Sequence, residues 1–558
     1  MESNRKFQTT AVSLAVALAL GSGSAYAISQ SGEQQNMNRL GHTDLQGRPS
    51  YQPNVIQYPD GRTMLFVGMH SGSPRPSPAC GNSNNTLPNP LNGGACENNG
   101  TMIIDVTDPR NPVEQLLIPA PAGGQSQMTR MCLGSDLTGD QQNKKVYLLR
   151  NVQGGASAGY QIYDVTDVKH PQLKSSVALR STHKLWWECN TGVAYLVGSK
   201  GAPSPLWRQA QSMVIVDWQN PEAAPVYLRT YGLPGGQPGT TGPTVPSLHG
   251  PISAHQHPDA NKSLARPRQL AGGGNNPDDI IGNRLYLAWG VGDDGVMQIL
   301  DRKQLLPPLS NNRGGVYNGS ADTPSDAELL SAQAGILYMS PDQGGHTSMP
   351  VFGVKPPSYQ KFNEFATRDV VLLASEATAD GRDGRCNEAP HWSFIVDVTV
   401  ENSKTAPPGT KTETNVWQGP MVLSTMSVDE RSGAKYPRGN YCGRGARFGV
   451  HSSEENFNNP YYGKLTSIAY FNGGVRMWDI REPQAPREVA FYVPEANANT
   501  DPDGYMTNNV EIDNRGYVYI VDRNGAGMDI LELTGCAKQI IDKDHACKDL
   551  GNNNAASN

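Results

Sequence analysis

Hydrophobic and polar residues alternate in short runs along most of the 558-residue chain. Runs of this kind, bounded by Gly, Pro and Asn, are typical of β-strands with one buried face. The segment 447–496 shows the pattern most completely, with a polar start at His451, an apolar run at 465–471, an Asn-Gly-Gly turn, a strand that ends on Asp479, and a last strand at 489–493. We predict that this segment forms one four-stranded antiparallel sheet.

The strand that ends on an aspartate recurs along the chain. Seven copies can be recognised, and their aspartates are Asp105, Asp164, Asp217, Asp301, Asp397, Asp479 and Asp529. Successive aspartates are 59, 53, 84, 96, 82 and 50 residues apart, so a constant core carries loops of variable length. An Asp side chain can cap the turn that follows, and the nearby prolines stop the strand. Repeats of this length predict an all-β fold, a seven-bladed β-propeller of four-stranded antiparallel sheets with long loops on one face.

The pattern at 103–109, two apolar residues followed by Asp-Val-Thr-Asp-Pro, resembles the repeats of the bacterial exported LVIVD-repeat proteins. The resemblance covers the seven copies and hence most of the chain after about residue 50. It implies an exported β-propeller.

The N-terminus has the pattern of a signal peptide. Arg5 and Lys6 precede an apolar run at 11–20 that is too short to span a bilayer, and Ala-Tyr-Ala at 25–27 is a small-x-small cleavage site. We therefore predict a signal peptide over 1–27, cleaved after Ala27, and a periplasmic or secreted protein without a transmembrane segment in the mature chain. Residues 28–50 would be an N-terminal segment that could close the ring, 51–535 the propeller, and 536–558 a C-terminal tail.

The composition of the chain limits the kinds of partner that it can bind and indicates which bonds its cysteines form. With 60 Gly, 42 Pro, 18% charged residues and a net charge of −6, the chain lacks the basic character of a nucleic-acid-binding protein. An even number of cysteines in an exported chain favours disulfides over zinc, because no C-x-x-C occurs. The sequence alone cannot choose among on the order of a hundred connectivities. The simplest is sequential: Cys80–Cys96, Cys132–Cys189, Cys386–Cys442 and Cys536–Cys547.

Four long insertions, at 71–99, 233–280, 305–345 and 377–391, are rich in Gly, Pro, Asn and Ser. They fall either between the second and third strands of a blade or between two blades. Both kinds of connection emerge on the same face of a propeller, so we expect these loops to surround one mouth of the axial channel. Loops on a rigid scaffold often carry binding functions.

Four histidines, His183, His249, His346 and His451, occur where inner strands should begin on successive blades. Inner strands line the axis, so these side chains should converge at the channel mouth, with Glu188, Glu376, Glu454, Glu455 and His391 nearby. Neutral imidazoles with a carboxylate are ligands for one divalent transition metal, Cu, Fe, Zn or Mn. The alternative is that each histidine is structural and hydrogen-bonds the backbone of a neighbouring blade.

The other blades contribute different polar residues to the mouth. Asn508 and Asn509 begin the last inner strand, Arg523 ends the strand after it, and the first two blades offer Tyr51, Asn54 and Arg130. This asymmetry would suit a small polar or anionic ligand. The candidate ligand-binding residues are His255, Arg130, Asn456 and Asn509.

The resemblance to LVIVD-repeat proteins bears on the same residues. Those proteins carry H-T-V-H-P at a strand start, D-E at the end of a second strand, and then R-F-G-x-H-N-x-H-E-N. This chain matches at His346, Thr347, Pro350, Glu376, Arg447, Phe448, Gly449, His451, Glu455 and Asn456. Met349 and Glu454 replace the second histidines, which implies a weaker, different or absent metal, although Met349 could serve a soft copper ion.

Two functions are compatible with these patterns. In the first, the chain is an exported enzyme whose histidines and Glu376 or Glu455 hold a metal, Arg130 or Arg523 orients the substrate, and a carboxylate acts as acid or base. In the second, it is a non-catalytic scaffold that binds a secreted partner protein or an envelope component through its loops. A propeller hosts both roles, so the sequence leaves open whether the protein is an enzyme.

Overall fold

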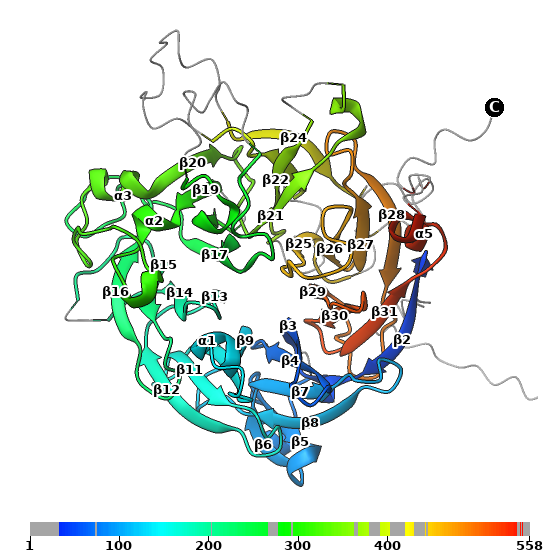
Figure 1. Cartoon of the computed structure of the whole chain (residues 1–558). Helices are drawn as coiled ribbons and strands as arrows, with labels where there is room; N and C mark the ends of the chain where they lie inside the picture. Colours follow the sequence, from blue (N-terminus) through cyan, green and yellow to red (C-terminus); the bar gives the residue numbers. More distant parts are fainter. Residues whose placement is uncertain are drawn as a thin grey trace, which may run out of the picture.

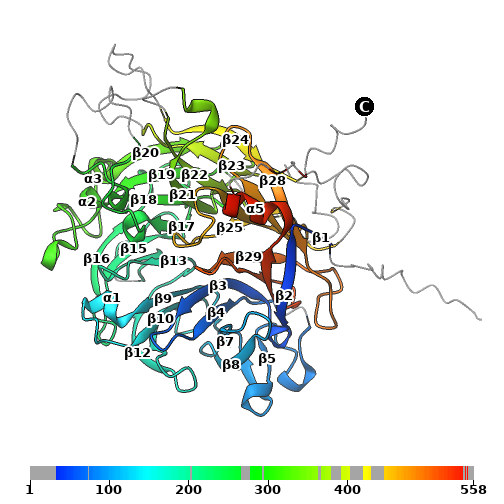
Figure 2. The ribbon, with the colours of Figure 1, turned by 45° about the vertical axis from the view of Figure 1, so that its right-hand side comes forward.

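The computed structural model describes residues 33–72, 75–201, 204–265, 277–291, 294–361, 366–378, 391–401, 419–428, 441, 445–543, 547 and 550. Its sheets stand around a central axis like the blades of a propeller (Figure 1). Figure 2 shows the same ring of sheets after a 45° turn. The chain is therefore an all-β propeller, as the strand pattern predicts.

Five sheets of this ring are separate and four-stranded, and within each of them neighbouring strands are antiparallel and follow one another in chain order. The first two sheets contain β3 (Ser50–Gln57), β4 (Thr63–Met69), β7 (Thr101–Asp105) and β8 (Val113–Ile118), and then β9 (Thr129–Leu133), β10 (Val146–Val152), β11 (Gly159–Asp164) and β12 (Gln172–Ala178).

The third sheet contains β13 (Leu185–Trp187), β14 (Val193–Gly198), β15 (Ser212–Asp217) and β16 (Val226–Tyr231). The fourth contains β17 (Leu248–Ser253), β18 (Arg284–Trp289), β19 (Val296–Asp301) and β20 (Gln333–Tyr338). The fifth contains β21 (Thr347–Val354), β22 (Arg368–Ala374), β23 (Ser393–Asp397) and β24 (Met421–Met426).

Nine further strands form one sheet with two halves. One half contains β25 (Phe448–Ser453), β26 (Leu465–Phe471), β27 (Val475–Asp479), β28 (Arg487–Val493) and, at its edge, β1 (Glu33–Gln35). The other contains β29 (Thr507–Ile512), β30 (Val518–Asp522), β31 (Met528–Leu533) and β2 (Met37–Thr43). A single residue pair, Phe471 with Thr507, joins the halves. The N-terminal strand β2 thus pairs antiparallel with β31, near the C-terminal end of the chain.

Short elements lie outside the sheets. They are the hairpin β5 (Thr86–Asn89) and β6 (Ala95–Asn98), the helices α1 (Gly134–Thr138), α2 (Arg302–Leu305), α3 (Asp326–Ala332) and α5 (Gly535–Lys543), and the 3₁₀ turns η1 (Leu45–Gly47), η2 (Pro78–Cys80), η3 (Pro90–Asn92), η4 (Ala254–Gln256), η6 (Ile281–Asn283), η7 (Ser310–Asn312) and η8 (Pro357–Tyr359). We expected the segment 305–345 to be a long loop, but the structure shows regular elements in it. It contains α3, which begins with a capping box of Ser325 and Glu328, and the outer strand β20.

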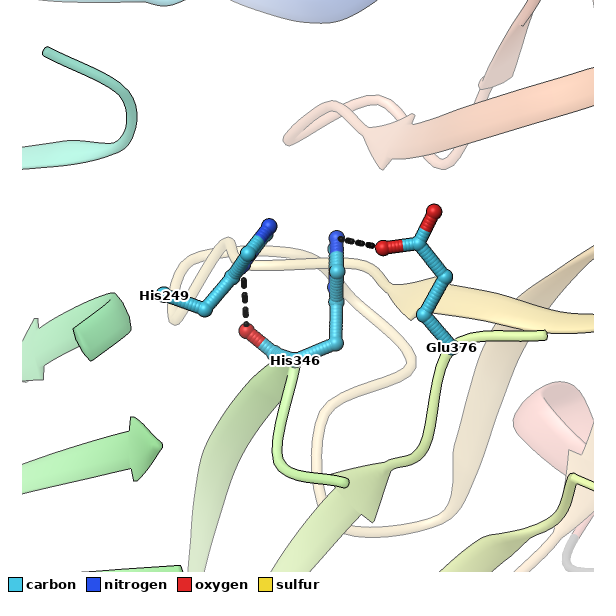
Figure 3. Close-up of side chains that lie close together, drawn as sticks. All are labelled: His249, His346 and Glu376. Carbon is cyan, nitrogen blue, oxygen red and sulfur yellow. Dashed lines mark hydrogen bonds and ion pairs between the residues drawn. The ribbon is translucent and has the colours of Figure 1, made fainter. Parts of the chain in front are cut away.

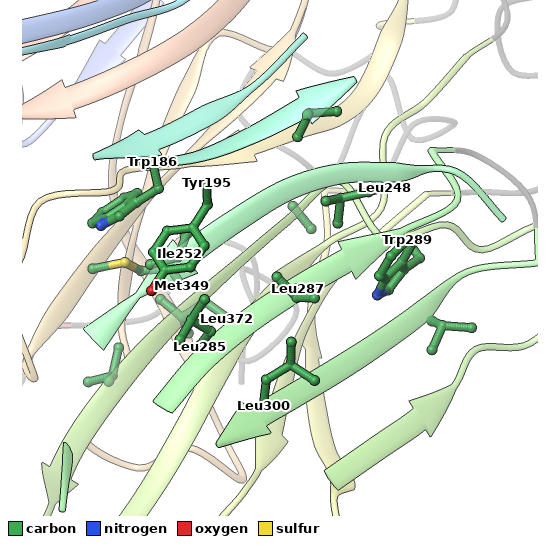
Figure 4. Packing of buried hydrophobic residues seen from close by; sticks show 14 of the residues in the cluster. Trp186, Tyr195, Leu248, Ile252, Leu285, Leu287, Trp289, Leu300, Met349 and Leu372 are labelled. Atoms are coloured by element: carbon green, nitrogen blue, oxygen red, sulfur yellow. The ribbon is translucent and has the colours of Figure 1, made fainter. Parts of the chain in front are cut away.

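The hydrophobic core consists of the layers between neighbouring sheets. One cluster combines Phe66 and Ile103 of the first sheet with Val146 and Leu148 of the second, and another joins Leu65 of the first sheet to Tyr519 in the last half-sheet. Figure 4 shows the largest cluster, where Trp186 and Tyr195 lie near Leu285 and Met349. Each sheet therefore buries its apolar faces against both neighbours, which fixes the inner strands around the axis.

The recurring aspartates explain why the third strand of each sheet ends where it does. Asp105, Asp164 and Asp397 are the last residues of their strands, and each Oδ1 accepts a hydrogen bond from the backbone N–H two residues later, at 2.9, 3.1 and 2.9 Å. In each case the backbone N–H bonds to the aspartate side chain instead of to a neighbouring strand, so the strand ends there.

Three of the four predicted disulfides are confirmed: Cys80–Cys96, Cys132–Cys189 and Cys536–Cys547. Cys132 lies in the inner strand β9, and Cys189 follows the inner strand β13, so this bond ties two neighbouring sheets together near the axis. Cys386 and Cys442 lie outside the described residues, as does the predicted signal peptide at 1–27. Among the described helices, none has the length and apolar character needed to cross a bilayer.

Candidate functional site

The structure brings the four predicted histidines together at the axis. His183, His249 and His346 lie at or just before the start of an inner strand, and His451 is the fourth residue of β25. Consecutive rings are in contact, with centroids 4.4 Å apart for His183 and His249, 3.9 Å for His249 and His346, and 4.2 Å for His346 and His451. All except the half-buried His183 are buried. Residues more than 250 positions apart in the sequence thereby form one cluster, which we call the histidine cluster.

Glu376 completes the histidine cluster from the end of the second strand of its sheet. Its carboxylate oxygens lie 3.7 Å from Nε2 of His346 and 3.7 Å from Nε2 of His451. Figure 3 shows that the side chains of His249, His346 and Glu376 point toward a common region. One potential ligand atom from each of these three buried residues lies within 4.8 Å of the other two.

Hydrogen bonds from Nδ1 orient these rings. His249 Nδ1 lies 3.1 Å from the carbonyl oxygen of His346, and His451 Nδ1 lies 2.5 Å from that of Asn508. A carbonyl only accepts, so both Nδ1 atoms carry the proton and both Nε2 atoms of the neutral rings keep a free lone pair. His346 Nδ1 lies 2.8 Å from the hydroxyl of Thr347.

The Nε2 atoms differ in their protein partners. His451 Nε2 is buried and has no hydrogen-bond partner among the described residues. His183 Nε2 lies 2.8 Å from His249 Nε2, whose lone pair faces it. On the other side of the His183 ring, Nδ1 contacts the amide of Gln127, whose Oε1 is buried without a partner. The Nε2 lone pairs of His249 and His451 thus face the interior of the cluster.

Burial keeps these imidazoles neutral. It lowers the pKa of His183 to about 3, with Lys184 contributing in the same direction. Burial also lowers the pKa of His249, His346 and His451 well below the usual range, assisted by the positive groups around them. Neutral imidazole is the form that ligates metals.

A second group of residues covers the cluster. The Tyr51 hydroxyl lies 3.3 Å from Nε2 of His346 and 3.4 Å from Nε2 of His183. Arg447 pairs with Glu376 at 2.9 Å, and Arg523 lies 3.9 Å from the same carboxylate oxygen. Arg523 also contacts Nε2 of His70 at 3.2 Å. Glu376 and Arg523, two candidate catalytic residues, thus belong to the histidine cluster.

The glycine before His451 is required by the geometry. Gly449 has φ +127°, and a Cβ at this position would lie 2.6 Å from the Cβ of Ala377. Ala377 follows Glu376 directly, and its N–H donates to the carbonyl of Val450 at 2.9 Å. The close approach of these two backbones therefore places Glu376 beside His451.

Glu455 and Arg130 lie further along the axis, away from the histidine cluster. Glu455 accepts from Lys184 at 2.6 Å and from Arg130, and Lys184 also donates to Thr347 Oγ1 at 3.0 Å. Burial by itself raises the pKa of Glu455, but the charges of Lys184 and Arg130 hold it below the usual range. A buried charged layer therefore separates the histidines from the other end of the inner strands.

Several candidates are placed elsewhere. His255 lies in η4, past the end of β17, and its Nδ1 contacts the carbonyl of Gly282 at 3.0 Å. Asn456 donates to the carbonyl of Ile512 at 2.7 Å. Asn509 is an exception, because its side-chain amide lies 3.1 Å from Nδ1 of His451 as well as 2.8 Å from Oε1 of Gln52. Glu188 forms a buried ion pair with Arg302 at 2.7 Å rather than joining the cluster.

Met349 does not face the histidine cluster, since its side chain packs in the hydrophobic layer shown in Figure 4. His70, Lys184 and Gln127 were missed by the sequence analysis. A signal for His70 existed, because His70, Glu376 and Arg523 all follow the second strands of their sheets, β4, β22 and β30.

Comparison with known proteins adds little. No protein-family model matches the chain, and no curated protein matches it either. Solved structures match weakly: the Dos1 propeller, with 9% identity, a TM-score of 0.41, and coverage of 90% of this chain and 96% of that one; Sqt1 from Saccharomyces cerevisiae, with 8%, 0.41, 89% and 99%; and a hypothetical selenium-binding protein from Sulfolobus tokodaii, with 10%, 0.41, 78% and 81%. The class of protein is defined by the structure itself: a β-propeller with a buried His/Glu cluster on its axis.

Proposed function

We propose that this chain is an exported, seven-bladed propeller of the LVIVD-repeat type that binds one divalent transition metal ion at the histidine cluster. The five separate sheets and the two halves of the nine-stranded sheet would be the seven blades. The three disulfides support an oxidising location, in the periplasm or outside the cell.

The observation that carries the metal proposal is the convergence of His249, His346 and Glu376 within 4.8 Å. Metal–ligand bonds of about 2 Å allow one ion to reach atoms at such separations after small adjustments. His183 and His451 have Nε2 atoms in reach of the same region, which gives a nitrogen-rich set that suits Cu, Fe, Zn or Mn.

The hydrogen bonds of the cluster also fit a cation. The backbone carbonyls of His346 and Asn508 hold two rings with their Nε2 lone pairs inward, which is the usual outer arrangement of metal-bound histidines. The side-chain nitrogen of Gln127 faces His183 Nδ1, and a turned amide would give its buried Oε1 a donor in His183 Nδ1. Nε2 of His183 and of His249 would then face each other as lone pairs at 2.8 Å, an arrangement that a bound cation stabilises.

When bound, such an ion would supply Lewis-acid or redox chemistry to a ligand at an open coordination position. The chain's own residues then define that ligand. Arg447 holds the Glu376 carboxylate, and the Arg523 side chain, 20% exposed, presents a cation at the edge of the cluster. The Tyr51 hydroxyl is placed to donate to an oxygen on the ligand. A small polar or anionic molecule fits these groups.

Elemental analysis of the tag-free protein purified from the oxidising compartment tests the metal proposal. We expect about one equivalent of Cu, Fe, Zn or Mn, lost in His346→Ala and retained in the control His170→Ala, whose side chain is 79% exposed. A folded wild-type protein that stays metal-free after reconstitution with each ion would refute the proposal and favour the non-catalytic scaffold.

A further inference from the structure

A cavity of about 410 Å³ lies at the far ends of the inner strands, beyond the charged layer. Its lining includes Arg130, Trp186, Gln256, Glu455, Asn456 and Glu511, and none of the four histidines. This volume lies within the range of small-molecule sites. The cavity is therefore distinct from the histidine cluster, and the metal proposal does not use it.

Arg130 is an incompletely paired buried cation in this cavity. It is 7% exposed, and its guanidinium carbon lies 4.5 Å from the ring centroid of Trp186. Among the described residues it makes one hydrogen bond, from Nη2 to Glu455, and its Nε is buried without a partner. A guanidinium has five N–H donors, so most of them are available.

Glu511 is an unpaired carboxyl in the same cavity. It is 3% exposed, and among the described residues its Oε2 is buried without a hydrogen-bond partner. Burial disfavours the charged form and raises the pKa of Glu511 well above its usual range, although the charge of Arg130 acts in the opposite direction. Glu511 therefore offers an O–H donor a short way from a cation.

The charges around the cavity do not balance. Lys184 and Arg130 share the single carboxylate of Glu455, which leaves one positive charge in excess, while Asp136 is exposed at the rim. Uncompensated buried charge is strongly unfavourable, and an anion would neutralise it.

We propose that this cavity is a second ligand site, which binds a small organic carboxylate. The carboxylate pairs with the free donors of Arg130, and a further oxygen of the ligand accepts a hydrogen bond from the carboxyl group of Glu511. In its favourable geometry, the ion pair between Arg130 and the carboxylate of the ligand is charge-assisted and bidentate. Such a pair selects carboxylates over neutral polyols. The polar residues at the end of the inner strands, including Gln256 and Asn456, would contact the rest of the molecule.

Calorimetric titration of the chelated, metal-free protein at pH 7 with acetate, lactate and succinate, and with glycerol as a neutral probe, tests the proposal. We expect at least one carboxylate to bind wild type. Arg130→Gln should weaken this binding about tenfold or more. Arg62→Gln, an exposed arginine outside the cavity, should leave it unchanged.

A second variant guards against a folding defect in Arg130→Gln. Glu511→Leu removes an unsatisfied buried polar group, so it should keep or raise the melting temperature while weakening carboxylate binding. His346→Ala should keep carboxylate binding even where it loses metal, so this inference and the metal proposal can fail separately. The inference is overturned if none of the three carboxylates binds, if only glycerol binds, or if both cavity variants bind as wild type does.

Discussion

Lys184 Nζ lies 2.6 Å from Glu455 Oε1 on the axis of the propeller, and both side chains are 3% exposed. The lysine follows His183 directly, and the glutamate comes four residues after His451, so the backbone that positions the histidine cluster also builds the charged layer beneath it. We expect Glu455→Leu to cost about 3–5 kcal/mol of unfolding free energy, because it leaves Lys184 and Arg130 buried without their shared carboxylate. The double variant Lys184→Met, Glu455→Leu should recover part of this loss in urea unfolding, because only Arg130 then lacks the carboxylate. A double variant as unstable as the single one would show that packing, not charge, governs this layer.

Metal should stabilise the folded protein. A ligand that binds only the native state adds about 2.7 kcal/mol at a hundred times its Kd. Chelation should therefore lower the melting temperature of wild type, and readdition of the native metal should restore it. In His249→Ala, where one of the three converging ligands is missing, the chelator and the metal should both have much smaller effects.

Gly449→Ala should disturb the histidine cluster as well as the fold. The new Cβ would lie 2.6 Å from that of Ala377, at a residue with φ +127°. We expect a loss of about 2–3 kcal/mol and weaker metal binding. Gly463→Ala is the matched control, since it has φ +79° and nothing within 4 Å, and it should cost only about 1 kcal/mol and leave metal content unchanged. Equal effects of the two variants would argue against a special role for the close contact.

The Cys132–Cys189 bond should contribute more to the stability of the fold than the Cys80–Cys96 bond does. It closes a chain segment of 57 residues and links two neighbouring sheets. Replacing both cysteines with serine should cost about 2–5 kcal/mol in denaturant unfolding. The Cys80–Cys96 bond closes only 16 residues within a surface loop, so its removal should cost less. The prediction fails if the order of the two losses is reversed.

Glu454 should make stability fall as pH rises. Burial raises its pKa to about 8, although the Asn456 N–H from which it accepts acts in the opposite direction, and its ordinary value is 4.5. Between these values the folded state holds a proton that the unfolded state releases. The contribution is therefore fully present below about pH 4.5 and is lost as pH rises toward 8, with a slope of at most about 1.4 kcal/mol per pH unit. Urea midpoints of Glu454→Gln at pH 5, 6.5 and 8 should lack this component of the wild-type slope.

The repeat pattern was enough to predict the propeller, because alternation and turn residues act locally. It also placed His183, His249, His346 and His451 at strand starts, which the ring brings together. The position of each side chain along the axis was harder to predict. An inner strand advances about 3.3 Å per residue. Glu455 is close to His451 in sequence and Arg130 is close to Gln127, yet both therefore lie well below the histidines along the axis.

Side-chain direction explains the other differences. Met349 is three residues after His346, and an odd spacing in a strand turns it to the opposite face, into the hydrophobic layer. Glu188 lies beyond the end of β13, where Arg302 neutralises it. Gln127 and Lys184 were missed because their roles depend on contacts between sheets that no local pattern encodes.

The pairing of β2 with β31 joins the two ends of the sequence, and His42 and Asp529, which meet there at 2.8 Å, are 487 positions apart. During synthesis β2 must therefore wait for β31, which is made much later. Until then the outer edge of β31 is uncovered, and such an edge can pair with other chains. Contacts of this sequence separation also form slowly. A ring fastened in this way cannot close until β31 has been synthesised, however early the other sheets form.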